Sequence, residues 1–396
     1  MTRARTIALG TLVLLLAATP FIPRGDEPDR ALVPSGEEEH AAPARARMGA
    51  LTEQMRREID RVVADGRAVG RVSARTASGA LADDLVRCAE FEGQRYCLGT
   101  GWTTRTQSEV QARVAAAAAR TARSVASDPG TGDLDALAML RRTSSLSPTD
   151  RAASERAELT AAARSVAKVW LLRHEIQGTP FPEGFLADHP EATVSANPTA
   201  APTKPRSAYP RKDWVLSSRR VTEQRRSYWC GPTAMQMIAW GWRDRRQPQR
   251  HWARRLGTTS NGTAITDIVR LINRATGWDN ENRAGRYITL DISDWSYGKW
   301  LLLNMRHVTD YRAPLVLHPI LLKRFYPYLD DDASGHFQVG RGYNKRGERP
   351  AFIGYFEPWN QQRFDPSEPY IDRVQWRSAY KSYRANRAHP HQNIGV

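Results

Sequence analysis

The first half of the chain has the hydrophobic spacing of helices. Around residues 51–63 the apolar side chains recur every three or four positions and share one helical face: Leu51, Met55, Ile59, Val62 and Val63. The alanine-rich stretch 106–126 also favours helix. A long helix is predicted to begin with Ser147 as its N-cap and Pro148 at its first position, and to end before Gly178. This half is therefore predicted to be mainly α-helical.

The second half of the chain mixes helical and alternating spacing. Its predicted helices are 230–241, 250–256, 263–276 and 297–307, and its predicted strands are 286–292, 314–318, 336–343 and 351–357, with a turn at 344–347. Helices come first and strands come later, an order that favours an α+β fold with an antiparallel sheet. Of the 12 Trp, 10 lie from Trp214 onward, so this half has the large side chains needed for a mixed core.

The N-terminus has a pattern of its own. Arg3 and Arg5 precede an apolar run from Ile7 to Ala18, which Pro20 ends. A basic start followed by such a run is typical of a secretory signal peptide, and the run is short for a spanning helix. We therefore expect a secreted, extracellular protein, surface-attached and membrane-associated only if the signal stays uncleaved.

Changes in composition divide the chain into segments. Residues 24–45 are polar with an acidic run, and the stretch 189–212 is rich in Pro, Ala and Thr. We predict a signal peptide 1–23, a disordered spacer 24–45, a helical accessory region 46–188, a linker 189–212, an α+β domain 213–385 and a tail 386–396. The accessory region shows no constellation for chemistry, so it is interpreted either as a pro-segment or as a permanent shielding, tethering or surface-binding domain.

The charge balance is strongly basic. Against 42 Asp+Glu the chain carries 58 Lys+Arg, which gives a net charge of +16. We interpret this as a solvated basic surface, which would also attract an anionic cell-surface polymer; no specific nucleic-acid partner is expected. The sequence has no phosphate-binding glycine loop and no zinc-peptidase motif, and the run Asp330–Asp332 lacks the offsets of an EF-hand. We therefore expect no cofactor and no metal.

The chain has three cysteines. Cys88 and Cys97 flank a plausible turn at Glu92-Gly93, so the two segments can fold back on each other. In an oxidising compartment this arrangement predicts a disulfide, with zinc the weaker alternative. The pairing leaves Cys230 unpaired, either as a reactive thiol or as a buried small side chain.

The position of Cys230 favours reactivity. It is followed by Gly231 and Pro232, and proline is tolerated in the first turn of a helix. Cys230 is therefore predicted to lie at a helix N-terminus, where the helix dipole and free backbone N–H groups favour a thiolate. A buried structural cysteine would more often lie within an apolar face.

A thiolate nucleophile requires a histidine partner. His336 stands at the start of a predicted strand after Gly335, where its imidazole can face a cleft. His318 is the rival, but the apolar run before it and the proline after it favour a packed strand end. We therefore predict His336 as the general base and acid.

The remaining roles fall to residues near these two. Glu357 ends the strand predicted to pair with that of His336, so its carboxylate is the predicted orienter of the imidazole, with Asn360 as the alternative. An oxyanion needs donors, and these are predicted to be the backbone N–H of Cys230 and the side-chain amide of Gln224.

These motifs resemble the C39-like branch of the papain-like cysteine peptidases. The matching elements are Gln224 with Cys230-Gly231-Pro232, then Gly335-His336-Phe337 with Gly342-Tyr343, then Glu357-Pro358-Trp359. The resemblance covers about residues 213–375 and implies a papain-like α+β domain, a Cys-His-carboxylate triad and peptide-bond hydrolysis without a cofactor. The family pattern usually has Asp before Pro-Trp, where this sequence has Glu357. Trp229 and Gly335 are expected to contact substrate.

The sequence therefore predicts a secreted cysteine peptidase that acts on a protein or a cell-wall peptide. Two alternatives use the same fold: a catalytically weak module that binds surface peptides or anionic cell-wall polymers, and an acyl transferase or amidase.

Overall fold

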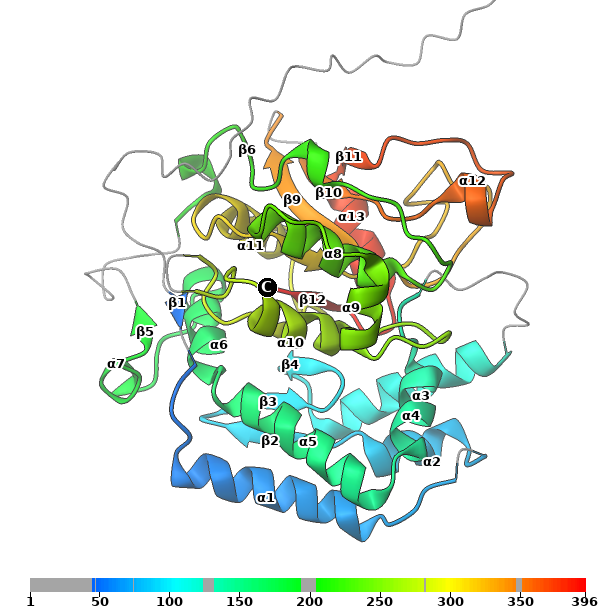
Figure 1. Cartoon of the computed structure of the whole chain (residues 1–396). Coiled ribbons are helices and arrows are strands. Elements are labelled where there is room, and N and C mark those ends of the chain that lie inside the picture. Colours follow the sequence, from blue (N-terminus) through cyan, green and yellow to red (C-terminus); the bar gives the residue numbers. More distant parts are fainter. Residues whose placement is uncertain are drawn as a thin grey trace, which may run out of the picture. The chain divides into compact units, whose positions relative to one another are not determined.

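The computed structural model describes residues 45–46, 48–73, 75–123, 132–193, 204–280, 283–346 and 351–396. The predicted signal peptide lies outside these residues, as does most of the predicted spacer and part of the predicted linker. The described residues combine many helices with one large sheet, so the α+β prediction is confirmed (Figure 1).

The N-terminal half is mainly helical, as its spacing predicts. Its helices are α1 (Glu53–Ala68), α2 (Ser78–Leu85), α3 (Gln107–Arg123), α4 (Ala136–Ser145), α5 (Pro148–Ala163), α6 (Val166–Leu172), the π-helical turn η1 (Arg173–Gln177) and α7 (Phe185–Asp188). Its strands are β1 (Arg45–Ala46), β2 (Cys88–Phe91), β3 (Gln94–Cys97), β4 (Gly101–Thr103) and β5 (Ala192–Thr193). The Ser147 side chain caps α5 by accepting the backbone N–H of Asp150, but the long helix predicted to run from there to Gly178 is divided into α5, α6 and η1. The predicted disulfide between Cys88 and Cys97 is present and joins β2 to β3.

The C-terminal half contains the helices and strands that the sequence predicts, shifted by a few residues at their ends. They are α8 (Cys230–Trp242), α9 (Gln249–Leu256), α10 (Ile265–Ala275), β7 (Thr289–Asp291), α11 (Tyr297–Thr309), β8 (Leu315–Leu317), β9 (Gln338–Asn344) and β10 (Phe352–Phe356). The structure adds η2 (Arg206–Ala208), β6 (Lys212–Trp214), η3 (Ser218–Arg220), α12 (Gln361–Phe364), β11 (Val374–Ser378), α13 (Ala379–Ala388) and β12 (Asn393–Gly395).

One ten-stranded sheet runs through both halves. Its order is β11-β10-β9-β8-β12-β7-β4-β3-β2, and β6 pairs with β9 off this path. Neighbouring strands are antiparallel except β4 and β7, which pair in parallel where Trp102 lies opposite Leu290. The last strand in sequence, β12, lies between β8 and β7, so the stretch 386–396 that follows the predicted domain supplies an interior strand (Figure 1).

The core of the C-terminal half forms where α8 and α10 bury their apolar faces. Met237 and Ile238 of α8 and Ile268 and Ile272 of α10 are all fully buried. Burying one such side chain stabilises the fold by about 1.5–3 kcal/mol relative to exposure. The indole N–H of Trp278 donates to the backbone oxygen of Ile238 at 2.9 Å, which satisfies its one polar group inside the core. This packing fixes the start of α8, where Cys230 lies.

Polar contacts also join the two halves. The Asp291 carboxylate on β7 accepts from the Thr103 hydroxyl at 2.8 Å and pairs with the Arg113 guanidinium at 2.9 Å. Arg142 of α4 pairs with Asp267 of α10 at 3.0 Å. Because Asp291 is buried, its partners are needed to offset the loss of water.

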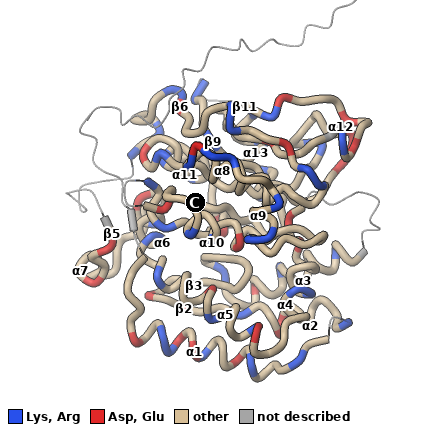
Figure 2. Tube along the Cα trace, viewed as in Figure 1, with Lys and Arg blue, Asp and Glu red and all other residues tan. Residues whose placement is uncertain are grey.

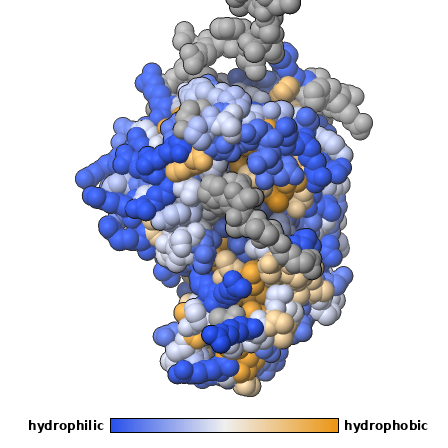
Figure 3. Space-filling model, turned by 90° about the vertical axis from the view of Figure 1, so that its right-hand side faces the viewer, coloured by the Kyte–Doolittle hydropathy of each residue, from blue (hydrophilic) through white to orange (hydrophobic). Residues whose placement is uncertain are grey.

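The surface is charged and mostly hydrophilic. Lys and Arg are spread over many elements rather than gathered in one block (Figure 2). The face in Figure 3 is mainly hydrophilic, with hydrophobic residues gathered in its lower part. Among the helices that the structure describes, none is both long enough and apolar enough to cross a membrane.

Candidate active site

Cys230 is the first residue of α8. The helix begins there because the backbone of Trp229 has non-helical angles, and Pro232 falls in the first turn, where its missing N–H costs no helical hydrogen bond. The hydroxyl of Thr233 donates to the backbone oxygen of Trp229 at 2.7 Å and tightens this turn. Cys230 is the free cysteine among the described residues, as the sequence predicts.

The Cys230 sulfur lies against the peptide bond between His336 and Phe337. The backbone N–H groups of Phe337 and Gly231 donate to it and favour the thiolate. Burial has the larger effect, and with the negative charges of Asp133 and Glu357 it raises the pKa of Cys230 well above its usual value. Desolvation thus outweighs the helix terminus on which the sequence argument rests.

His336 lies just before β9 and is held through one ring nitrogen. Its backbone N–H donates to the oxygen of Pro319 at 2.9 Å, and its Nε2 lies 2.7 Å from Oε1 of Glu357. The other ring nitrogen, Nδ1, is buried and has no hydrogen-bond partner among the described residues. Since Glu357 is an acceptor, the proton is on Nε2 and the Nδ1 lone pair is free to accept one.

Glu357 follows β10 and accepts every hydrogen bond that its carboxylate can hold. Oε1 accepts from His336 Nε2 and from the backbone N–H of Trp359 at 2.9 Å. Oε2 accepts from the Tyr328 hydroxyl at 3.0 Å and from Nε2 of Gln338 at 2.7 Å. Burial alone raises the pKa of Glu357, but the positive charge that His336 carries when it is protonated and these hydrogen bonds outweigh burial and hold the pKa below its usual value.

The alternative orienter, Asn360, lies elsewhere in the network. Its side-chain amide donates to the Glu223 carboxylate at 2.8 Å, and its oxygen accepts from the backbone N–H of Arg363. Glu357 is thus the residue that contacts His336 in this structure. The backbone N–H of Gln224 donates to the oxygen of Pro358 at 2.8 Å, which ties the two segments together.

Gln224 uses its side chain to shape the loop before Cys230. Its amide nitrogen donates to the backbone oxygens of Arg226 at 3.1 Å and Ser227 at 2.5 Å. The predicted oxyanion donor therefore holds the loop 225–228 in this conformation. Donation to a substrate oxygen requires the amide to release at least one of these carbonyls.

The two residues predicted to contact substrate lie on different sides of the site. Trp229 lines an open hollow of about 580 Å³ together with Arg226, Tyr228, Arg250 and Arg254. The Arg226 guanidinium lies over the Trp229 ring, with its Cζ 5.2 Å from the ring centroid. Gly335 faces inward instead, since a Cβ on it would lie 2.4 Å from Oδ2 of Asp133.

The side chains that meet at the site are covered. Cys230, His336 and Glu357 are each 0% exposed, and Asp133 from the N-terminal half is also buried beside them. Sequence reasoning missed Asp133 because no chemical motif surrounds it. It also missed Tyr328 and Gln338, although the alternation along β9 indicates that Gln338 and His336 face the same side.

Asp133 is the centre of a buried histidine cluster. Its Oδ2 lies 2.9 Å from Nε2 of His389 and 3.3 Å from Nε2 of His318, and these side chains offer the ligand atoms that a cation would use. The backbone N–H of His391 donates to Nδ1 of His389 at 3.1 Å, so the proton of His389 is on Nε2 and is donated to Asp133. The contacts are therefore those of a hydrogen-bonded cluster. His318, the rival histidine, is packed here and stacks on Phe337.

A second group of acidic side chains lies near Trp359. Asp330, Asp365 and Glu368 bring their carboxylates within 4.8 Å of one another, and the indole N–H of Trp359 donates to Glu368 at 3.1 Å. Burial, followed by the charges of the neighbouring aspartates, raises the pKa of Glu368 to about 7.

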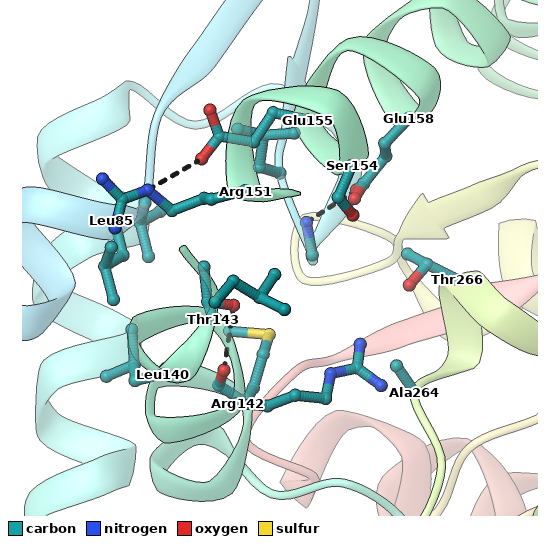
Figure 4. Close-up of a pocket in the computed structure, with 15 residues that line it drawn as sticks. Leu85, Leu140, Arg142, Thr143, Arg151, Ser154, Glu155, Glu158, Ala264 and Thr266 are labelled. Atoms are coloured by element: carbon teal, nitrogen blue, oxygen red, sulfur yellow. Dashed lines mark hydrogen bonds and ion pairs between the residues drawn. The ribbon is translucent and has the colours of Figure 1, made fainter. Parts of the chain in front are cut away.

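A small cavity in the N-terminal half lies apart from the candidate catalytic residues. It encloses about 80 Å³ between α4, α5 and the start of α10, and none of Cys230, His336 and Glu357 lines it (Figure 4). Figure 4 shows Arg142 and Glu158 among its lining residues. Glu158 accepts from the backbone N–H of Gly99 at 2.7 Å and from the Tyr96 hydroxyl at 3.0 Å, so this carboxylate is used in packing.

Comparison with known proteins finds a family match in the C-terminal part of the chain. Residues 216–387 match the model of the Peptidase_C39 like family, so the resemblance that the motifs suggest is confirmed. The matched segment contains Cys230, His336 and Glu357 and ends within α13. No curated protein and no solved structure matches the chain at a significant level.

Proposed function

We propose that the protein is a secreted cysteine peptidase in which Cys230 is the nucleophile, His336 the general base and acid, and Glu357 the residue that orients His336. The family match supports peptidase chemistry, and the contacts around these side chains support the individual roles. The N-terminal apolar run supports secretion.

The observation that carries the proposal is the unequal use of the two His336 nitrogens. Nε2 is fixed by Glu357 at 2.7 Å, whereas the buried Nδ1 has no hydrogen-bond partner among the described residues. A buried polar atom without a partner costs about 1–3 kcal/mol, and a hydrogen bond from a nearby donor would remove this cost. The Cys230 sulfur accepts from the backbone N–H of Phe337, the residue after His336, and we assign it as the donor that reaches this lone pair in the reacting complex.

The reaction follows from these roles. Nδ1 of His336 takes the Cys230 proton, and the sulfur forms a bond to the substrate carbonyl carbon as the C=O electrons move to oxygen. The imidazolium gives its proton to the leaving nitrogen as the C–N bond breaks, which leaves an acyl-enzyme. His336 then takes a proton from water as the water oxygen bonds to the acyl carbon, and the C–S bond breaks to release the acid while the imidazolium returns its proton to the sulfur. The Glu357 carboxylate stabilises the imidazolium in both steps.

The open hollow beside Trp229 supports a preference for acidic substrates. Arg226, Arg250 and Arg254 are exposed there, and its described lining contains no acidic residue. Guanidinium groups bind carboxylates in bidentate fashion, so a peptide or a cell-wall polymer with carboxylate groups fits this surface. The double variant Arg250→Ala/Arg254→Ala should raise KM for an acidic peptide and leave a neutral one unchanged.

The test of the catalytic roles is hydrolysis of labelled casein by the full chain. Cys230→Ser and His336→Ala should each lower turnover by about 10³-fold or more, because the triad acts as a unit. His174→Ala is the matched control, since His174 is half-buried and stacks on Phe181 away from the site. If casein binds but is not cleaved, and Cys230→Ser binds equally well, the chain is a binding module and the proposal is wrong.

A further inference from the structure

A short piece of the N-terminal half lies across the candidate active site. Residues 132–134, called the strap below, pair in parallel with Thr263, which precedes α10. The backbone N–H of Leu134 donates to the oxygen of Thr263 at 2.8 Å, and the N–H of Thr263 donates to the oxygen of Gly132 at 3.0 Å. The strap is thus an extended segment that uses both backbone groups of Thr263, as a bound peptide does in strand addition.

Thr263 is close to the nucleophile. A Cβ placed on Gly231, the residue after Cys230, would lie 2.6 Å from Cβ of Thr263. The backbone edge on which the strap lies is therefore packed directly on the first turn of α8. A peptide on this edge would pass the Cys230 side chain.

The other side of the strap is pressed against the loop before Cys230. Gly132 has a φ of +111°, and a Cβ on it would lie 2.4 Å from the carbonyl carbon of Tyr228. A Cβ on Gly262 would lie 2.4 Å from the backbone oxygen of Asp133. Backbone therefore meets backbone on both sides, so no side chain and no substrate fits between the strap and the rim of the site.

Asp133 anchors the middle of the strap beside the catalytic pair. Its carboxylate accepts from His389 at 2.9 Å, lies 3.3 Å from His318, and abuts Gly335, the residue before His336. Its negative charge also raises the pKa of Cys230. Asp133 thus disfavours the reactive form of the Cys230 thiol.

We propose that the backbone edge of Thr263 and the Tyr228–Gly231 rim form the substrate-binding cleft, and that residues 132–134 occupy it as a built-in pseudosubstrate. This rests on the proposed function, because it gives the cleft to the same Cys230 site. With the strap in place, Cys230 and His336 are both 0% exposed. A peptide substrate would bind as an extended strand on Thr263 after the strap leaves, so the unaltered full chain hydrolyses casein only through the fraction of molecules in which the strap is open.

The test is the rate at which iodoacetamide alkylates Cys230 in the folded full chain, with casein hydrolysis measured in parallel. Gly132→Ala forces the strap from Tyr228, because the added Cβ meets backbone and the φ is positive. Labelling should rise about ten-fold or more, since the labelling of a covered thiol follows the population of the open form. Gly70→Ala is the matched control: Gly70 also has a positive φ, but a Cβ there meets nothing within 4 Å.

The outcomes separate the two proposals. Faster labelling with faster hydrolysis supports both. Faster labelling without hydrolysis supports the strap and contradicts the peptidase. Two results would overturn the strap proposal. One is a labelling rate that Gly132→Ala leaves unchanged, and the other is casein hydrolysis by the unaltered chain that Gly132→Ala does not increase. The midpoint of urea unfolding shows whether a variant is globally destabilised. If Gly132→Ala lowers this midpoint more than Gly70→Ala does, labelling and hydrolysis are measured on Asp133→Asn instead. This isosteric change weakens the hydrogen bonds that anchor the strap and adds no atom.

Discussion

Replacing Glu357 by Gln tests whether the buried carboxylate holds the site together. The change keeps the shape of the side chain, removes its charge and exchanges one acceptor oxygen for an NH₂ donor. In the structure Oε1 accepts from His336 and the backbone of Trp359, while Oε2 accepts from Tyr328 and Gln338. A glutamine oxygen can serve one of these pairs, and its NH₂ group then faces the donors of the other.

The cost follows from the donors that lose their acceptor. If the amide oxygen keeps His336 and Trp359, the Tyr328 hydroxyl can turn to accept, but the Gln338 amide nitrogen faces another donor. A buried donor without an acceptor costs about 1–3 kcal/mol, and the remaining hydrogen bonds lose the extra strength that the charge gives. We therefore expect Glu357→Gln to lower the free energy of unfolding by about 2–4 kcal/mol.

Urea unfolding followed by tryptophan fluorescence measures this change. With an m value of about 3 kcal/mol/M, the midpoint should fall by about 1 M. Glu53→Gln on α1 is the control; its side chain is 67% exposed, and its midpoint should be unchanged. A midpoint for Glu357→Gln equal to that of the unaltered chain would refute the reasoning, because it would mean that the hydrogen bonds to Glu357 contribute nothing.

The same variant has a pH signature. The pKa of Glu357 is lowered in the folded protein, so its contribution to stability is present above the pKa of the unfolded chain and is lost as the pH falls through the folded value. Unfolding free energies measured from pH 7 to pH 3 should therefore converge for Glu357→Gln and the unaltered chain at the acid end. A difference that stays constant with pH would contradict this assignment.

Two further predictions concern other parts of the fold. Replacing Cys88 and Cys97 by Ser should lower the free energy of unfolding by about 2–3 kcal/mol, since the disulfide closes a loop with a sequence separation of 9. A calorimetric Tm of this variant equal to that of the unaltered chain would contradict the prediction. The pKa of Glu368 is raised to about 7, so stability should fall as the pH rises from about 4.5 through 7, and Trp359 fluorescence should change over the same range as the carboxylate beside its indole ionises. Glu368→Gln should abolish that fluorescence change, and its persistence would assign the titration to another group.

Local sequence determined the helices and the placement of the motifs on them. Ser147 and Pro148 set the start of α5, and Gly231-Pro232 set the start of α8, because capping and proline geometry depend on neighbours in the chain. The disulfide and the hairpin that carries it were predictable for the same reason. His336 and Glu357 could be proposed as partners because the sequence predicts two pairing strands with these residues at their ends, and the structure brings Nε2 of His336 to 2.7 Å from Oε1 of Glu357.

Tertiary structure determined which distant segments of the chain pack around the candidate site. Residues 393–395 follow the predicted domain as part of a tail, yet β12 lies between β8 and β7, because its backbone finds partners that are distant in sequence. The burial of Cys230 reversed the pKa expected at a helix N-terminus, since desolvation depends on everything packed around the sulfur.

Asp133 shows the same limit most clearly. No sequence pattern around Asp133 indicates chemistry. Its contacts in the structure are with His318 and His389, which are separated from it by 185 and 256 residues in the sequence. A sequence motif records which groups could react, because their chemistry is carried by residues at fixed spacing. Whether substrate reaches those groups depends on which distant backbone segments pack over them, and here that is the strap from the other half of the chain.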